Sequence, residues 1–370
     1  MRIAFLDASH LKFCAATPFE RPLGGSQSAL CYLSAELARL GHAVTIFNGC
    51  RTASDSDGIQ IRNFSDFQVP GVLNTFDFAV VLNSAVGHIC RRDLSARIPL
   101  ILWTQYAHDQ PSVRQLHSPE ERESWTGIVF VSNWQRDCYE SVYSVPRAKS
   151  RVLRNAVCPA FADLGFDARQ VAIQEPLTLF YASTPFRGLD VLLQAFPKIR
   201  DAVPGTRLRV FSSMDVYQLS PEQDQYHFLY ERCRSTPGVE YVGSVGQRRL
   251  AEELRGAAAL SYPSTFAETS CIAVLEAMAL GAAVLTTRLG ALPETAAGWA
   301  SMVEWQADKF RLASQFAALA VETLRAMRED PSAASAQRLQ RIDFVRENYL
   351  WPARAQEWVQ WLSELGGRAA

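Results

Sequence analysis

Short apolar runs, each bounded by polar or turn residues, recur along the whole chain. In the first half they fall at residues 2–8, 43–47, 78–82, 100–104, 128–131 and 151–153. Runs of this length without alternation are typical of strands that are buried on both faces of a parallel sheet. After the first run, Leu30, Leu33, Leu37 and Leu40 recur at helical spacing. Strand, helix and strand in this order predict a βαβ unit and a parallel sheet.

A second series of the same kind follows residue 176. Its strand-like runs alternate with helical patterns and fall at residues 177–182, 208–212, 239–242, 258–262 and 283–286. Between the two series, residues 158–176 are irregular, and we interpret them as a linker. From Lys309 onward the pattern is helical and ends in a Trp-rich amphipathic segment. Two such series predict an α/β protein with two Rossmann-like, doubly wound domains.

Length and composition agree with this organisation and exclude several classes of protein. A chain of 370 residues is long enough for two domains that each bury a core. The net charge of −1 gives no global attraction for nucleic acid, so we expect no nucleic-acid partner. The eight cysteines form no C-x-x-C pair and are interpreted as reduced thiols. With no long apolar run and no signal-peptide pattern, we expect a cytoplasmic protein.

A glycine loop follows the first predicted strand and precedes the first predicted helix. It contains Gly24, Gly25 and Ser26. Unhindered N–H groups at a helix N-terminus bind phosphate, because these donors are unpaired and the helix dipole favours an anion. The alternative is an ordinary glycine turn with Ser26 as the N-cap. The residues by themselves leave both interpretations open.

His108 comes just after the predicted strand at 100–104, where open α/β sheets bind ligands. The alternative is a histidine in a surface loop, and His117 is a competing candidate with weaker placement. Asp55-Ser56-Asp57 has the D-x-D pattern of metal-dependent transferases, but it lies in a polar turn detached from any buried strand. We interpret it as a surface turn. No Cys/His cluster has zinc spacing, so we expect no metal site and no cofactor.

The most informative stretch is residues 262–281, which carries two glutamates. It predicts a strand end, a loop with Glu268, and a short apolar helix with Glu276 in its first two turns. An ionised carboxylate in a buried helix is costly unless a ligand or a fixed hydrogen bond compensates it. Glu276 is therefore a candidate ligand-binding residue.

This stretch resembles the signature of retaining nucleotide-sugar glycosyltransferases of the GT-B fold, in the large family called glycosyl transferases group 1 (family 4-like). The matching residues are Pro263-Ser264, Glu268, Glu276, Ala277-Met278-Ala279, Gly281 and Gly290-Ala291-Leu292-Pro293-Glu294. One departure is that Thr269-Ser270-Cys271 stands where the family has a small, Gly-containing step. Side chains there crowd the approach of a phosphate to the backbone.

The resemblance also implies roles for residues outside this stretch. Arg187 falls on a family Lys that binds the diphosphate, whereas Ser183 (or Ala182) stands at a position where the family has a second cation. Arg187 would then carry more of the contact with the diphosphate. Gly24 and Gly25 match a phosphate-binding loop, and His108 matches a residue near the transferring sugar. The resemblance further implies that Glu268 holds sugar hydroxyls, that Glu276 accepts hydrogen bonds from ribose, and that the backbone at Thr269, Ser270 and Cys271 faces the phosphates.

The sequence therefore predicts a retaining, metal-independent glycosyltransferase with two domains facing across a cleft. The expected domains are residues 1–160 on the acceptor side, 161–345 for the nucleotide sugar, and a final helix at 346–370 that packs back on the first domain. The expected partners are a nucleotide-sugar donor and a saccharide, lipid-linked or other acceptor, with peripheral contact at the inner membrane face as one option. The alternatives are a nucleotide-sugar epimerase of the same fold, a non-catalytic nucleotide-sugar-binding relative, and a periplasmic-type binding protein.

Overall fold

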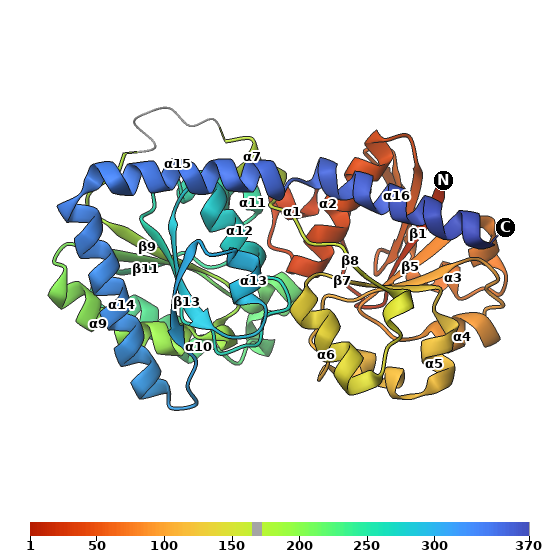
Figure 1. Ribbon diagram of the computed structural model, residues 1–370, viewed down its shortest axis with the longest axis horizontal. Helices are drawn as coiled ribbons and strands as arrows, with labels where there is room; N and C mark the ends of the chain where they lie inside the picture. Colours follow the sequence, from red (N-terminus) through yellow and green to blue (C-terminus); the bar gives the residue numbers. More distant parts are fainter. Residues whose placement is uncertain (165–171, 370) are drawn as a thin grey trace. The chain divides into compact units, whose positions relative to one another are not determined.

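The computed structural model describes residues 1–164 and 172–369, and it divides into two compact units, each with its own sheet (Figure 1). Unit 1 comprises Met1–Thr17, Gly25–Ala156 and Trp351–Ala370, and unit 2 comprises Pro18–Gly24 and Val157–Leu350. The predicted class, α/β with two parallel-sheet domains, is confirmed. Residues 165–171 of the predicted linker lie outside the described residues.

The sheet of unit 1 has the strand order β3-β4-β2-β1-β5-β6-β7-β8, and all neighbouring strands are parallel except the β3–β4 pair. The central strands are apolar and fully buried, as expected for strands covered on both faces. The bounds are β1 Arg2–Asp7, β2 Ala43–Asn48, β3 Ser54–Ser56, β4 Ile59–Asn63, β5 Phe78–Leu82, β6 Leu100–Trp103, β7 Gly127–Phe130 and β8 Ser150–Val152.

Strands β3 and β4 form a hairpin at the edge of this sheet that the sequence pattern did not predict. Asp55 lies in β3 and Asp57 in the tight turn that follows, where its φ is 55°. Both aspartates are exposed, and the Asp55 side chain accepts a hydrogen bond from the Gly58 N–H. The D-x-D motif therefore lies on a surface hairpin.

The larger helices of unit 1 are α2 Gly25–Arg39, α4 Gly87–Arg92, α5 Pro119–Ser124, α6 Asn133–Tyr143 and α16 Trp351–Ala369. Short helical turns are α3 Phe64–Phe67, η1 Val72–Thr75, η2 Pro111–His117 and η3 Arg147–Lys149. Helix α1 is Thr17–Glu20; its first residue is assigned to unit 1 and the rest to unit 2.

Helix α16 packs within unit 1 through its tryptophans. The Trp358 ring meets the Trp103 ring of β6 at a centroid distance of 5.2 Å, and Trp351 meets Tyr32 of α2 at 5.9 Å. Trp351 and Trp358 are almost fully buried. The last helix, drawn in blue, thus completes the core around strands from the start of the chain (Figure 1).

The sheet of unit 2 has the order β11-β10-β9-β12-β13-β14, and all its neighbouring strands are parallel. The bounds are β9 Thr178–Ala182, β10 Arg207–Phe211, β11 Val239–Tyr241, β12 Ala259–Tyr262, β13 Ala283–Arg288 and β14 Ala300–Glu304. Five of these strands were predicted, and β14, which is only half buried, was not. The chain runs outward from β9 in one direction and from β12 in the other. Ligands of open α/β sheets bind at such a switch point, beyond the carboxyl ends of the strands.

Helices α9 and α14 pack together against this sheet, while α12 packs with α13 and α15 (Figure 1). The bounds are α7 Pro159–Ala162, α9 Leu189–Ala202, α10 His227–Ser235, α11 Gln247–Glu253, α12 Ile272–Ala279, α13 Leu292–Ala296, α14 Lys309–Glu329 and α15 Pro331–Asn348, with helical turns η4 Pro185–Arg187, η5 Met214–Tyr217 and η6 Pro221–Gln223. Within the part of the chain that the structure describes, no helix is long and apolar enough to cross a membrane.

Candidate functional site

Three loops meet at the carboxyl edge of the sheet in unit 2, at the switch point between β9 and β12. They follow β9, β12 and β13. The Ala291 N–H donates to the Glu268 carbonyl over 2.7 Å, and the Thr287 hydroxyl donates to the Ser264 carbonyl over 2.7 Å. These bonds fix the loop after β12 against the end of β13.

Two glycines allow the loops to approach one another this closely. Gly188 has φ 113°, and a Cβ there would lie 2.2 Å from the Pro263 carbonyl oxygen. Gly290 has φ 60°, and a Cβ there would lie 2.6 Å from the Glu268 carbonyl oxygen. Because both positions combine left-handed backbone with contact to a neighbouring main chain, only glycine fits without rearrangement.

The packed loops bring Arg187 and Glu268 together. The Arg187 Nη1 atom lies 2.9 Å from Glu268 Oε1, and the Glu268 side chain is only 5% exposed. Burial would lower the pKa of the guanidinium, but the Glu268 carboxylate holds it above its ordinary value. The guanidinium also lies 4.6 Å from the centre of the Phe266 ring, which adds a cation–π contact. Arg187 Nε is buried without a hydrogen-bond partner among the described residues, so the cation is not fully satisfied.

Tyr262, the last residue of β12, belongs to the same cluster and was missed from the sequence. Its hydroxyl donates to Glu268 Oε1, and the Ser183 hydroxyl lies 3.5 Å from the Tyr262 oxygen. Thus Ser183, predicted as a binding residue, reaches Glu268 through Tyr262. A tyrosine directly before the Pro-Ser pair, at the end of a fully buried strand, was the signal that could have identified it.

Helix α12 begins after Thr269, Ser270 and Cys271. Cys271 is the N-cap, has extended backbone geometry and makes no side-chain capping bond. The first N–H groups of a helix have no partner within it, so an anion placed there gains hydrogen bonds and a favourable dipole. Burial raises the pKa of the Cys271 thiol, which keeps it uncharged beside such an anion. Thr269 and Cys271 are buried, and Ser270 is half buried.

Glu276 lies in the second turn of α12 and is 5% exposed. Burial raises the pKa of this carboxyl to about 8. Its Oε1 atom has no hydrogen-bond partner within residues 1–164 and 172–369. The prediction of a glutamate in a buried helix is confirmed, and the compensating donors are absent among the described residues.

In unit 1, Gly25 is the first residue of α2 and is exposed, whereas Gly24 is buried and is grouped with unit 2. The Gln27 side chain of α2 donates over 3.3 Å to Asp7 at the end of β1. Asp7 also accepts two hydrogen bonds from Ser9, and burial raises the pKa of its carboxyl. The first turn of α2 is thereby fixed to the carboxyl end of β1.

His108 lies in the loop 104–108 after β6, and α6 holds this loop along its length. Gln135 donates to two of its carbonyls over 3.1 and 2.8 Å, Tyr139 donates to one over 2.9 Å, and Tyr143 donates to that of His108. The His108 side chain makes no such bond, since its buried Nδ1 has no partner among the described residues. The loop is fixed through its backbone, and the imidazole is left unpaired at Nδ1.

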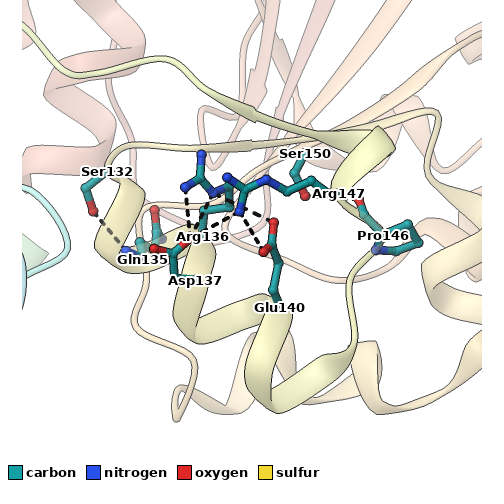
Figure 2. A network of polar contacts seen from close by, with 8 residues as sticks. All are labelled: Ser132, Gln135, Arg136, Asp137, Glu140, Pro146, Arg147 and Ser150. Atoms are coloured by element: carbon teal, nitrogen blue, oxygen red, sulfur yellow. Dashed lines mark hydrogen bonds and ion pairs between the residues drawn. The ribbon is translucent and has the colours of Figure 1, made fainter.

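The outer face of α6 carries a separate ion-pair network (Figure 2). Arg147 lies 2.8 Å from Glu140 and 3.3 Å from Asp137, and Arg136 lies 2.9 Å from Asp137. Arg147 is well exposed, so its two ion pairs contribute little to stability. The network fastens the segment that leads into β8 to the helix that holds the His108 loop.

The structure thus brings Arg187, Glu268 and Ser183 into one cluster, and it places Glu276 on the helix that follows. Gly25 and His108 lie in unit 1. Within the described residues, no group of three or more His, Cys, Asp or Glu side chains is placed to hold a metal ion.

Comparison with known proteins finds a family likeness within unit 2. Residues 175–322, which include Arg187, Glu268 and Glu276, match the model of the family described as glycosyl transferases group 1. The likeness to this family is therefore shown for this part of the chain. A D-inositol 3-phosphate glycosyltransferase of Segniliparus rotundus is 30% identical over 172 residues, which are 45% of this chain and 36% of the relative. The chain therefore spans about a third of the curated relative that it matches.

Solved structures extend the likeness to the fold of the whole chain. Sucrose-phosphate synthase from Thermosynechococcus elongatus has a TM-score of 0.71 at 15% identity and covers 100% of both chains. A glycosyltransferase from Rickettsia africae has a TM-score of 0.72 at 13% identity, covering 98% of this chain and 97% of the other. The Anabaena protein HepE, solved with UDP, has a TM-score of 0.69 at 14% identity and covers 98% of this chain and 100% of the other. At these identities they show the fold, which is GT-B.

Proposed function

We propose that the protein transfers a sugar from a nucleotide diphosphate sugar to an acceptor, with retention at the anomeric carbon. The observation that carries the proposal is the Arg187–Glu268 pair at the switch point of a glycosyl transferases group 1 domain. A cation for a diphosphate and a carboxylate for sugar hydroxyls lie there side by side, next to the N-terminus of α12. Solved neighbours of the same fold include complexes with UDP and with UDP-glucose, which supports a nucleotide-sugar donor.

In this proposal the negative charge that develops on the departing nucleoside diphosphate is stabilised by Arg187 and by the N–H groups that begin α12 at Thr269, Ser270 and Cys271. The Gly24 and Gly25 amides contribute in the same way. Glu268 accepts hydrogen bonds from hydroxyls of the transferring sugar. Glu276 accepts them from the ribose, which supplies the donors that its buried carboxylate lacks in the described residues. His108 orients the transferring sugar.

Retention is proposed from the resemblance to the retaining family, and the way Glu268 is held bears on whether a covalent intermediate forms. One of its oxygens accepts hydrogen bonds from both Arg187 and Tyr262, which lowers its nucleophilicity and suits a residue that binds hydroxyls. We therefore propose that no covalent sugar–enzyme intermediate forms. Proton NMR of the first product tests the course, because an inverted anomeric centre would contradict it.

The decisive experiment is a panel of UDP-, GDP-, ADP- and dTDP-sugars in a thermal-shift assay, followed by product analysis. A ligand at a hundred times its Kd stabilises the folded protein by about 2.7 kcal/mol. The matching donor is then incubated with and without saccharide and lipid-linked acceptors. A new glycoside supports transfer, while conversion of the donor alone into an epimer identifies the epimerase instead. Binding without turnover identifies a non-catalytic relative.

We also propose that turnover needs no divalent metal, since Arg187 and backbone N–H groups take the place of a cation at the diphosphate. Activity should persist in EDTA. Complete loss of turnover in EDTA with recovery in Mg²⁺ or Mn²⁺ would contradict this. We further propose a cytoplasmic location with peripheral contact at a membrane, which cell fractionation tests. The acceptor is proposed to be a saccharide, a lipid-linked molecule or another acceptor, which the acceptor panel tests.

A further inference from the structure

Glu268 is held through one oxygen only. Arg187 and Tyr262, which come from the ends of neighbouring strands, both donate to Oε1. Among the residues that the structure describes, no group donates to the other oxygen, Oε2. A carboxylate oxygen has room for further hydrogen bonds, so Oε2 is available to a ligand that brings its own donor.

The Tyr262 hydroxyl is itself held firmly in place. Tyr262 is 0% exposed, and its ring packs on Tyr181 at a centroid distance of 5.7 Å. Its backbone carbonyl accepts a hydrogen bond of 2.7 Å from Thr286 of β13. Burial, and next the Glu268 charge, raise the pKa of the phenol well above its ordinary value, so it remains a donor at any working pH.

We propose that Tyr262 is a positioning residue that orients Glu268 so that Oε2 faces a hydroxyl of the transferring sugar. The inference rests on the proposed function, because it needs a sugar at Glu268. It matters most when Arg187 turns to the diphosphate, since Tyr262 is then the donor that remains on Oε1. Tyr262 ends β12 and lies just before Pro263, where the residues that match the family signature begin.

The test compares Tyr262→Phe with Tyr181→Phe, alone and combined with Glu268→Gln. Tyr181 is a matched control, because it is also 0% exposed and its hydroxyl donates to a backbone carbonyl, that of Thr184, over 2.7 Å. Both variants lose one buried hydroxyl and keep the ring. Only Tyr262→Phe removes a hydrogen bond to Glu268.

We expect Tyr262→Phe to lower kcat by about tenfold to a hundredfold, as for a hydrogen bond to a charged group, while the Kd for the nucleoside diphosphate stays within about twofold. The preference for the nucleotide sugar over the nucleoside diphosphate, measured by calorimetry, should fall in parallel. In the Glu268→Gln protein, Tyr262→Phe should lower kcat only slightly further. Tyr181→Phe should lower kcat by the same factor in the wild type and in Glu268→Gln.

Equal losses in Tyr262→Phe and Tyr181→Phe, or a Tyr262→Phe effect that persists undiminished in Glu268→Gln, would overturn the inference and leave the proposed function standing. Failure of the proposed function is seen in the wild-type protein instead. If UDP-glucose, GDP-mannose and ADP-glucose neither bind nor react there, the function and the inference that rests on it are both overturned.

Discussion

At the scale of single residues, Glu276 shows how a buried charge reports on a ligand. Because burial raises its pKa to about 8, the folded protein holds a proton there that the unfolded chain releases near pH 4.5. The unfolded state therefore binds fewer protons between these values, and stability falls as pH rises through this window. The expected loss is several kcal/mol at most. Urea unfolding from pH 5 to 8.5 should show this fall in the wild type and not in Glu276→Gln.

The same carboxyl should make nucleotide affinity depend on pH. If ribose hydroxyls bind the ionised form, as we propose, binding below about pH 8 must displace the proton. Affinity should then rise by up to about tenfold per pH unit from pH 6 to 8 and level off above. Calorimetric binding measurements with UDP, GDP and ADP test this. Glu276→Gln is the control, because protonation of the nucleotide phosphates affects binding to both proteins equally. Parallel profiles in the two proteins would mean that Glu276 does not contact the nucleotide.

Arg187 is expected to have two roles, one before the donor binds and one after it. It now neutralises Glu268, and we propose that it contacts the diphosphate when the donor binds. Arg187→Ala should weaken binding of the nucleoside diphosphate by about 1.5–3 kcal/mol more than that of the nucleoside, and it should also slow transfer. Arg187→Lys should recover only part of the loss, because an ammonium lacks the planar two-pronged geometry.

The matched control is Arg288→Ala, which removes an exposed ion pair to Glu304 on the same sheet. It should leave both affinities unchanged. If removing the phosphates costs Arg187→Ala as much affinity as it costs the wild type, then Arg187 does not touch them. Arg248 and Arg249 would then be the next basic residues to examine.

At the scale of elements, the site is made by the packing of three loops, and Gly290 is the point where that packing is closest. Gly290→Ala introduces strain at φ 60° and a clash with the Glu268 main chain. Gly298→Ala has φ 89° but meets nothing within 4 Å. Both substitutions should lower the free energy of unfolding by about 1–2 kcal/mol, because a side chain disfavours left-handed backbone. Gly290→Ala should lose additional stability because of the clash, and it should also lower kcat because the clash moves Glu268. Gly298→Ala should do neither.

Thermal unfolding and steady-state kinetics of the two variants check this expectation. A Gly290→Ala protein that is as active as Gly298→Ala would show that the position of Glu268 does not depend on the loop after β13.

The elements also show which parts of the structure the sequence could predict. Fully buried strands such as β5 and β6 leave an uninterrupted apolar run, so they were found. Strand β3 is largely exposed and polar, and β14 is only half buried, so neither leaves a clear apolar run. The sequence around Glu268 and Glu276, within one loop and one helix, made them candidates. The contact of Tyr262 and Arg187 with one carboxylate oxygen depends on how β9 and β12 pair, and no local pattern encodes it.

At the scale of the whole molecule, unit 1 is completed by the last helix of the chain. Its sheet begins with β1, yet α16 supplies Trp358, which packs on Trp103, only after all of unit 2 has been traversed. Trp358 is 1% exposed, so Trp358→Ala should destabilise unit 1 by about 3–5 kcal/mol through lost burial and the cavity left behind. The residues proposed to bind the nucleotide through their side chains, Arg187 and Glu276, lie in unit 2. In calorimetric unfolding, unit 1 of Trp358→Ala should unfold at a lower temperature than unit 1 of the wild type.

Below that transition, UDP, GDP or ADP should bind Trp358→Ala with an affinity within about twofold of the wild type, because the side chains that contact the nucleotide are unchanged. Trp305→Ala is the control, since Trp305 lies in unit 2 and is 44% exposed. It should change neither the unfolding temperature nor the nucleotide affinity. A large loss of nucleotide affinity in folded Trp358→Ala would show that the integrity of unit 1 governs binding. The Gly25 amide, which lies in unit 1, would then be the first group to examine for a contact with the nucleotide.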